Sequence, residues 1–143
     1  MATFNGKSGD DFIDRSLSGS GDVIDGKDGN DLLVGGPQND SILGGKGNDQ
    51  IDGNAGSDTV FGGQHNDSIW GDNGNDRLSG DDGSDTVSGG NGNDTVFGGN
   101  GNDTVWGDEG NDSVDAGQNS DVVFGGNGND TLFGNHGNDY IEG

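Results

Sequence analysis

The sequence contains no cysteine, one proline, one methionine and only five lysine and arginine residues among its 143 positions. Without cysteine no disulfide can stabilise the chain, and the redox compartment stays undetermined. Five basic against 27 acidic residues give a formal net charge of -22, which argues strongly against nucleic-acid binding. No apolar run approaches the length of a membrane-spanning helix, so no membrane insertion is expected. The N-terminal stretch MATFNGKSGD lacks the basic and apolar regions of a conventional N-terminal signal peptide.

Hydrophobic residues are also scarce, at 24% of the chain. With so high a charge, this is the composition of a disordered protein. The acidic residues are not gathered in blocks, however, but recur in phase with 34 glycines. The repeating unit is Gly-x-x-Gly-x-Asp-x-aliphatic-x, and GGNGNDTVF at 89–97 is a complete copy. Such regularity predicts a repeat fold and not an unstructured low-complexity segment.

Thirteen units follow one another without a break over residues 26–142. Two less regular units precede them, separated by Arg15 and Ser16. We therefore expect a single repeat domain over residues 1–143, in which residues 1–25 form an irregular N-terminal cap and the first two repeats. The eighth position is Ile, Leu or Val in every unit, from Ile13 to Ile141. The sixth position is always aspartate: Asp11, Asp22, Asp31, Asp40, Asp49, Asp58, Asp67, Asp76, Asp85, Asp94, Asp103, Asp112, Asp121, Asp130 and Asp139.

The unit itself predicts strands and turns in alternation. The three residues around each eighth-position aliphatic are rich in Thr, Val, Ile and aromatics, which favour strands. Glycine at the first, fourth and often second positions is expected to supply positive φ angles in the turn, and asparagine at the fifth tolerates them. Strand, turn, strand, turn gives an 18-residue coil. Stacked coils form an all-β solenoid of about seven and a half coils, with two short parallel sheets enclosing the aliphatic side chains.

Stacking creates an electrostatic problem that only cations solve. Aspartates of neighbouring coils would lie about 5 Å apart, where each pair repels by about 3 kcal/mol at an effective dielectric constant of 20. The turns offer carboxylate and carbonyl oxygens, which select calcium or magnesium, and flexible carbonyl cages suit calcium. The fifteen turns lie in two rows, and each row has one gap fewer than it has turns, so there are 13 gaps between stacked turns. We predict up to about 13 bound Ca²⁺.

The unit at 89–97 resembles the GGxGxDxUx nonapeptide of the RTX family, and the resemblance covers residues 6–142. It implies a right-handed parallel β-roll that folds on meeting extracellular calcium. It also implies that Asp94 shares one ion with Asp76 and another with Asp112. The resemblance further implies that the chain is exported by a type I system and serves as a folding and structural module of a secreted or cell-surface protein. Carbonyl ligands implied by the resemblance include Gly71, Asn73, Gly74, Gly89, Gly90, Asn91, Gly92, Gly98, Gly99, Asn100, Gly101, Gly107, Glu109 and Gly110.

Some turns depart from this pattern. The fourth glycine is replaced by Ser20, Gln38, His65 and Asn119. Positive φ at a non-glycine residue costs on the order of 1–2 kcal/mol, so we expect weaker calcium binding there, least affected at Asn119. The last repeat is followed by one residue, without a recognisable cap or export signal. Calcium-loaded chains are therefore expected to associate end to end or to fray from the C-terminal coil, while residues 1–5 seal the other end.

No enzymatic activity is predicted, because no serine has a base nearby and the only histidines, His65 and His136, lie in turns. The stretch DGKDGNDLL from Asp25 looks slightly like an EF-hand loop but lacks glutamate at its twelfth position. The GxGxxG-like strings are by-products of the repeat, since no helix is expected after them.

Outward-facing ninth positions carry aromatic side chains. Phe61, Phe97 and Phe133 recur every second coil on one face, and Trp70 and Trp106 do so on the other, where Phe124 also lies. These side chains either pack across the strands of an exposed sheet or form a face for a glycan or protein partner. An ice-binding face would need a regular threonine array, which Arg77 interrupts.

Overall fold

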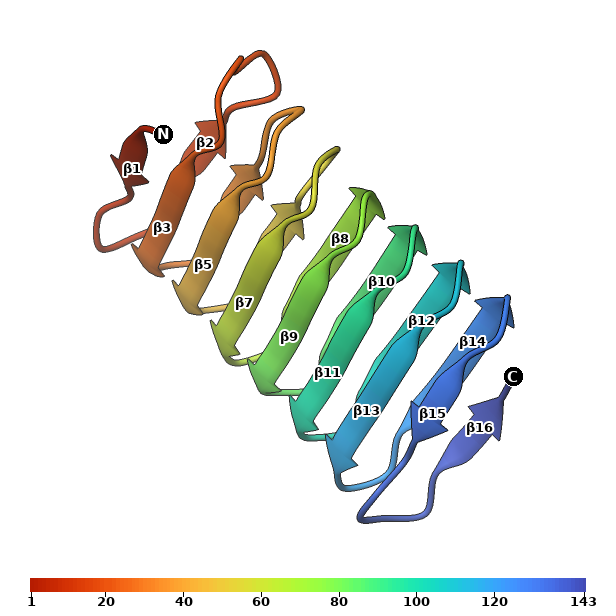
Figure 1. Ribbon diagram of the computed structural model, residues 1–143. Helices are drawn as coiled ribbons and strands as arrows, with labels where there is room; N and C mark the ends of the chain where they lie inside the picture. Colours follow the sequence, from red (N-terminus) through yellow and green to blue (C-terminus); the bar gives the residue numbers. More distant parts are fainter.

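The computed structural model describes residues 1–143 as 16 parallel strands joined by turns, in two eight-stranded sheets (Figure 1). It has no helix with the length and hydrophobicity of a membrane span. The first sheet contains β1 (Thr3–Asn5), β3 (Val23–Asp28), β5 (Ser41–Lys46), β7 (Thr59–Gln64), β9 (Arg77–Asp82), β11 (Thr95–Asn100), β13 (Ser113–Gln118) and β15 (Thr131–Phe133). The second sheet contains β2 (Phe12–Asp14), β4 (Leu32–Val34), β6 (Gln50–Asp52), β8 (Ser68–Asn73), β10 (Thr86–Asn91), β12 (Thr104–Glu109), β14 (Val122–Asn127) and β16 (Tyr140–Glu142).

The strand register confirms the 18-residue coil. Val87 of β10 pairs with Ile69 of β8 and with Val105 of β12, which lie 18 positions before and after it. The predicted all-β solenoid with two parallel sheets is therefore confirmed. There are eight coils instead of seven and a half, because β1 adds a strand ahead of the first repeat. Phe4 of that strand pairs with Ile24, so it occupies the place of an eighth-position aliphatic.

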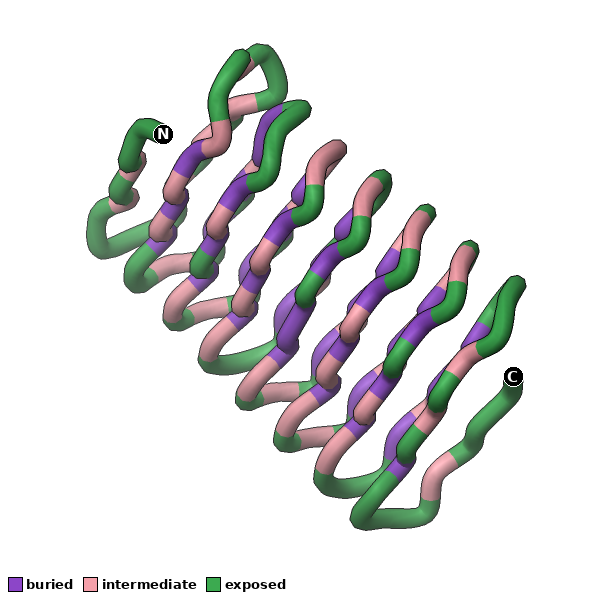
Figure 2. Tube along the Cα trace, viewed as in Figure 1, coloured by how far each residue is buried: buried purple, intermediate pink, exposed green.

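The core consists of eighth-position side chains, as the alternation of the repeat predicts, together with Ala116, which replaces the first glycine of its repeat. Along strands β3 to β14 these residues are buried, while most of their neighbours are partly exposed (Figure 2). Ile141 of the terminal strand β16 is exposed. Ile13 and Leu132 are only partly buried and pack against the two ends of the core. The buried core residues are Ile24, Leu33, Ile42, Ile51, Val60, Ile69, Leu78, Val87, Val96, Val105, Val114, Ala116 and Val123.

Most strands are longer than the predicted tripeptides. In the middle of the roll they contain six residues, as in Thr95–Asn100, so pairing continues through the first three positions of the following repeat. Only the fourth to sixth positions then remain as a turn. β4 stops at Val34, and its neighbour β6 is equally short. Pro37, at the third position after β4, has no N–H to donate to the ladder, which explains the early end.

The glycines at the second and fourth positions of the turn act as predicted, whereas the glycine at the first position does not. The fourth position has positive φ as expected, for example 144° at Gly92. The second position also has positive φ, even where it is not glycine, as at Asp72 (69°). The first position does not, so the prediction for it was wrong. A Cβ on Gly89 would lie 2.6 Å from both Asp94 Oδ2 and the Gly107 carbonyl oxygen, so this glycine provides space and not a special φ.

The four turns without the fourth glycine fall into two pairs. His65 (φ 79°) and Asn119 (φ 81°) adopt the strained conformation that was predicted for them. Ser20 and Gln38 do not have positive φ, so the prediction of strain was wrong for these two. Their turns follow another path, in which Ser20 lies within the loop that contains the inserted Arg15 and Ser16. Gln38 follows Pro37, whose ring restricts the local backbone.

Candidate metal centres in the turns

The sixth-position aspartates form a ladder along each row of turns. The backbone N–H of Asp76 donates to Asp94 Oδ1 at 2.8 Å, and the N–H of Asp94 donates to Asp112 Oδ1 at 2.8 Å. The same bond joins aspartates 18 residues apart from Asp22 to Asp139. The turn thus places each carboxylate against the coil that precedes it, and Asp94 lies between the two aspartates with which it was predicted to share ions.

The second carboxylate oxygen, Oδ2, is left without a partner. In ten turns it is buried and accepts no hydrogen bond. A buried polar atom without a partner is uncommon in folded proteins and calls for a ligand or an unusual role. The aspartates concerned are Asp31, Asp49, Asp58, Asp67, Asp76, Asp85, Asp94, Asp103, Asp112 and Asp121.

Burial makes these carboxylates hard to ionise. Burial, together with the smaller effect of neighbouring carboxylates, raises the pKa of Asp58, Asp67 and Asp103 to about 7. The same causes raise the pKa to about 6 for four others, Asp49, Asp76, Asp85 and Asp94. Their Oδ1 hydrogen bonds act in the opposite direction but do not compensate. A cation beside Oδ2 would offset both the cost of burying the charged carboxylate and the repulsion between neighbouring carboxylates.

The remaining donors in each gap are carbonyl oxygens. The Gly107 carbonyl approaches Gly89 from the next coil, on the side where Asp94 Oδ2 lies. The carbonyl of Gly92, at the fourth position, accepts no hydrogen bond from the protein and faces Gly110 of the next coil. No group of three or more Asp, Glu or His side chains is arranged to hold a metal ion, so a cation would take most of its ligands from the backbone. Such an all-oxygen set fits calcium.

One set of carbonyls that the resemblance implied as ligands is engaged elsewhere. These are third-position carbonyls, and each accepts a hydrogen bond from the fourth-position N–H of the preceding coil. The N–H of Gly92, for example, donates to the Glu109 carbonyl at 2.7 Å. These bonds belong to the lengthened strands. The carbonyls concerned are those of Asn73, Asn91, Asn100 and Glu109.

A model of the RTX calcium-binding nonapeptide repeat, which spans four copies, matches the chain in overlapping segments. They are residues 18–51, 43–78, 52–87, 79–114, 88–123 and 115–143. The chain belongs to this RTX repeat family. Among curated proteins, none matches the chain significantly. Membership agrees with the donor set described above, and the protein is a β-roll built from repeats of the RTX calcium-binding family.

Three turns at the N-terminal end of the RTX roll differ, because their Oδ2 has a partner within the protein. The donors are Lys7 N to Asp11 (2.5 Å), Arg15 Nε to Asp22 (3.1 Å) and Gly36 N to Asp40 (2.6 Å). Hydrogen bonds from Ser18 and Arg15 lower the pKa of Asp22, in contrast to the raised values along the roll. Two of these turns are those with Ser20 and Gln38, where weak calcium binding was predicted.

The turns with His65 and Asn119 resemble the regular RTX turns instead. Asp67 and Asp121 follow these residues, and both keep a buried Oδ2 without a partner. Substitution of the fourth glycine therefore does not by itself alter the carboxylate arrangement. His65 and His136 are exposed, and no acidic or histidine cluster forms around either.

Sequence reasoning missed a second ladder, at the fifth position of the RTX repeat. The side-chain oxygen of Asn75 accepts the backbone N–H of Asn93 at 2.7 Å, and Asn93 accepts that of Asn111 at 2.8 Å. Serine takes the same role at Ser57 and Ser84. The tolerance of asparagine for positive φ, noted from the sequence, is not used at this position, because none of these residues has a positive φ. Only the 18-residue register reveals that a side-chain acceptor is needed here.

The aromatic side chains lie on the outer faces as predicted. Trp106 and Phe124 stack with ring centroids 5.8 Å apart, and Arg77 lies over the ring of Phe97 at 4.6 Å. Trp70 is 39% exposed and Phe133 is 52% exposed. The Phe61, Phe97 and Phe133 row is interrupted by Ser79 and Asp115. Stacking thus occurs within part of the surface, while Trp70 and Phe133 remain accessible.

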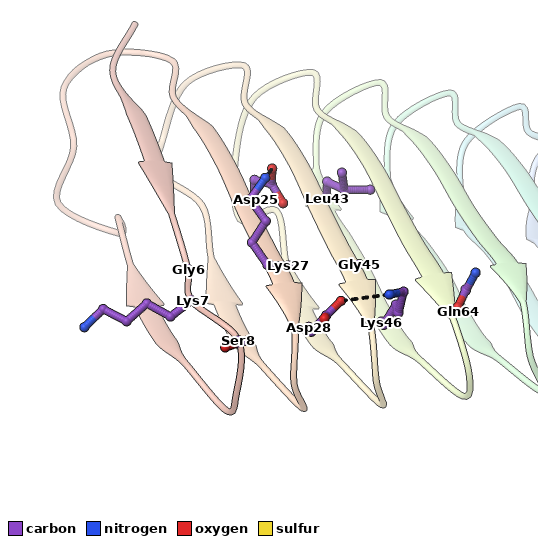
Figure 3. Close-up of a pocket in the computed structure, with 10 residues that line it drawn as sticks. All are labelled: Gly6, Lys7, Ser8, Asp25, Lys27, Asp28, Leu43, Gly45, Lys46 and Gln64. Carbon is purple, nitrogen blue, oxygen red and sulfur yellow. Dashed lines mark hydrogen bonds and ion pairs between the residues drawn. The ribbon is translucent and has the colours of Figure 1, made fainter.

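A hollow on the outer face of the first sheet lies near the N-terminal end of the roll (Figure 3). Lys7, Lys27 and Lys46 border it, and they are three of the five basic residues in the chain. Lys27 pairs with Asp25, and Lys46 lies 3.2 Å from Asp28. Because acidic neighbours neutralise these two lysines and the hollow contains no histidine, it does not resemble a catalytic site.

Proposed function

We propose that this RTX chain is a calcium-dependent folding module, disordered without calcium at neutral pH and ordered as a β-roll when calcium is bound. The observation that carries this proposal is the set of ten buried Oδ2 atoms without partners. An unsatisfied buried acceptor costs about 1–3 kcal/mol and more when charged, so ten cost on the order of 10–30 kcal/mol. The net stability of a typical domain is only about 5–15 kcal/mol. Bound cations would remove this penalty.

We place the ions in the ten gaps that these oxygens line, on both edges of the roll. Each gap would use the sixth-position aspartates of two stacked turns together with backbone carbonyls. Ten Ca²⁺ supply 20 positive charges against a net charge of -22. The earlier prediction of up to 13 ions included the gaps of Asp11, Asp22 and Asp40, whose Oδ2 atoms have protein partners. We therefore favour ten.

The physiological role follows from this calcium dependence. RTX repeats are typical of secreted proteins. Inside a cell, where free calcium is low, the chain would stay unfolded and suited to export. Outside, calcium would order it as a structural module of a secreted or cell-surface protein.

A matched pair of substitutions in one turn tests this proposal. Asp85→Asn and Asp82→Asn remove the same charge three residues apart, but Asp85 is buried in the candidate site while Asp82 is exposed. By calorimetric titration, Asp85→Asn should lose one or two bound ions or bind calcium at least tenfold more weakly at its gaps. Asp82→Asn should bind as the unchanged protein does. Equal ion counts and affinities in both variants would contradict the placement.

A second candidate function is binding of a neutral glycan to the outer faces. It is favoured by the exposure of Trp70 (39%) and Phe133 (52%), because aromatic rings stack on sugars. Tryptophan fluorescence of the calcium-loaded protein, titrated with soluble neutral polysaccharide, would detect it. The Trp70→Ala variant should then lose the response. An unchanged spectrum at high polysaccharide concentration leaves cross-strand packing as the role of the aromatics.

The C-terminal coil supports a third element of the proposal, which is self-association in calcium. β16 pairs on one side only, with β14, and Ile141 is 45% exposed there. Unpaired strand edges favour addition of another chain. Light scattering against protein concentration should show calcium-dependent growth. A molecular mass that stays constant at all concentrations would exclude association through this edge.

A further inference from the structure

The inserted residues Arg15 and Ser16 interrupt an otherwise regular frame. They shift the pairing by two, so that Thr3 pairs with Val23 and Phe12 with Leu32 at a spacing of 20 residues instead of 18. The strands on both sides keep their places in the sheets. The loop after β2 absorbs the insertion and extends beyond the neighbouring turns (Figure 1). The insertion therefore changes one turn only and leaves the stack intact.

The side chain of Arg15 returns from this loop to the aspartate of the same turn. Its Nε donates to Asp22 Oδ2 at 3.1 Å, and the carboxylate of Asp22 is fully buried. This is the atom that has no partner in ten other turns. The guanidinium also lies 3.9 Å from the ring centroid of Phe4 in β1. Backbone bonds hold the loop in place, with Arg15 N donating to the Val34 carbonyl at 2.8 Å.

The other oxygen of Asp22 is satisfied as well. Oδ1 accepts from the backbone N–H of Ala2 at 3.3 Å and from Ser20 Oγ at 3.4 Å. The turns of Asp11 and Asp40 also satisfy their Oδ2, but through neutral backbone N–H groups. Arg15 is thus the one cationic side chain paired with a sixth-position aspartate.

We propose that the guanidinium of Arg15 is a resident cation that replaces one calcium ion in the gap lined by Asp22 Oδ2. Because the chain closes this gap itself, the coils of β1 to β5 order at lower calcium than the rest of the roll. They then present a formed edge on which calcium-loaded coils stack toward the C-terminus. This inference rests on the proposed calcium-dependent folding, and it adds a starting point and a direction to it.

Hydrogen exchange at sub-saturating calcium tests the inference, with the amides of Val23 and Ser41 as reporters of the first coils. They donate to the carbonyls of Ala2 and Asp22. Arg15→Gln should speed their exchange at least about tenfold, since it leaves Asp22 buried and unpaired. Arg77→Gln is the matched control, because Arg77 also lies over a phenylalanine ring but pairs with no carboxylate. It should change exchange at these amides less than twofold.

The double variant Arg15→Gln/Asp22→Asn keeps the test decisive if the single variant fails to fold. It removes both charges, so protection of Val23 and Ser41 should return toward that of the unchanged protein. The inference is overturned if Arg15→Gln and Arg77→Gln behave alike, or if the double variant is no better than the single one. The amide of Thr95, in the middle of the roll, separates the two proposals. If the Thr95 amide is protected without calcium, the proposed function is refuted. If its protection depends on calcium as expected but Arg15→Gln leaves exchange at Val23 and Ser41 unchanged, only the proposal of a resident cation is refuted.

Discussion

Acidification should fold the roll in the absence of calcium. Burial raises the pKa of seven sixth-position aspartates from 3.8 to about 6 or about 7 in the folded chain. In the unfolded chain the same carboxyls titrate near their ordinary values. The folded state therefore binds more protons than the unfolded state between about pH 4 and pH 7, and the stability of the metal-free roll falls as the pH rises through this window.

The size of the effect follows from the number of groups. At pH 5 a carboxyl with a pKa of 6 is about nine-tenths protonated, whereas one with a pKa of 3.8 is less than about one-tenth protonated. Seven such groups take up about six protons when the metal-free chain folds at this pH. Each proton removes a buried charge and turns Oδ2 into a donor for the carbonyl oxygens beside it. At pH 8 neither state binds these protons, and the full cost of the buried carboxylates opposes folding.

Circular dichroism of calcium-stripped protein between pH 4 and pH 8 measures this directly, with proton uptake recorded in weakly buffered solution. We expect β signal near pH 5 and a coil spectrum near pH 8. Asp85→Asn should reduce the proton uptake by about one, whereas Asp82→Asn should change it much less, because the charge of Asp82 is only a minor cause of the raised pKa of Asp85. The reasoning is refuted if β content is independent of pH or increases from pH 5 to pH 8.

Three further predictions concern single features of the turns. Gly89→Ala should lower the free energy of unfolding in calcium by about 1–3 kcal/mol, because its Cβ meets Asp94 Oδ2 and the Gly107 carbonyl; thermal denaturation showing no loss would contradict this role of the first glycine. His65→Gly should raise the free energy of unfolding by about 1 kcal/mol by removing a strained φ of 79°, and an unchanged midpoint would show that the strain is negligible. Calcium added near pH 6 should release protons, because ions displace them from carboxyls whose pKa burial has raised; a titration with no acidification would argue against these aspartates as ligands.

The architecture was predictable from the sequence because the repeat is strict. A fixed aliphatic residue at the eighth position determines the row of core side chains from Ile24 to Val123. A fixed aspartate at the sixth position determines which carboxylates stack. Both follow from the period alone, without knowledge of any side-chain contact. The composition of the turns was enough to indicate calcium, because glycine, asparagine and aspartate offer only oxygen donors.

The details that escaped prediction depend on contacts between coils. The role of Gly89 comes from the Asp94 carboxylate and a carbonyl 18 residues ahead, and no local propensity encodes that space. The hydrogen bond from Asn93 to Asn75 likewise exists only in the correct register. The early end of β4 could have been read from Pro37, whose missing N–H was not considered. From the sequence Arg15 is only an interruption of the repeat, because its ion pair with Asp22 depends on how the loop between them folds back.

The central claim is that ten buried carboxylate oxygens make the roll depend on calcium. Circular dichroism at pH 7.5 in excess chelator, followed by titration with calcium and separately with magnesium, tests it most directly. The account predicts a coil spectrum in chelator, a cooperative gain of β signal with millimolar calcium and much less with magnesium at the same concentration. A stable β spectrum in excess chelator would contradict it.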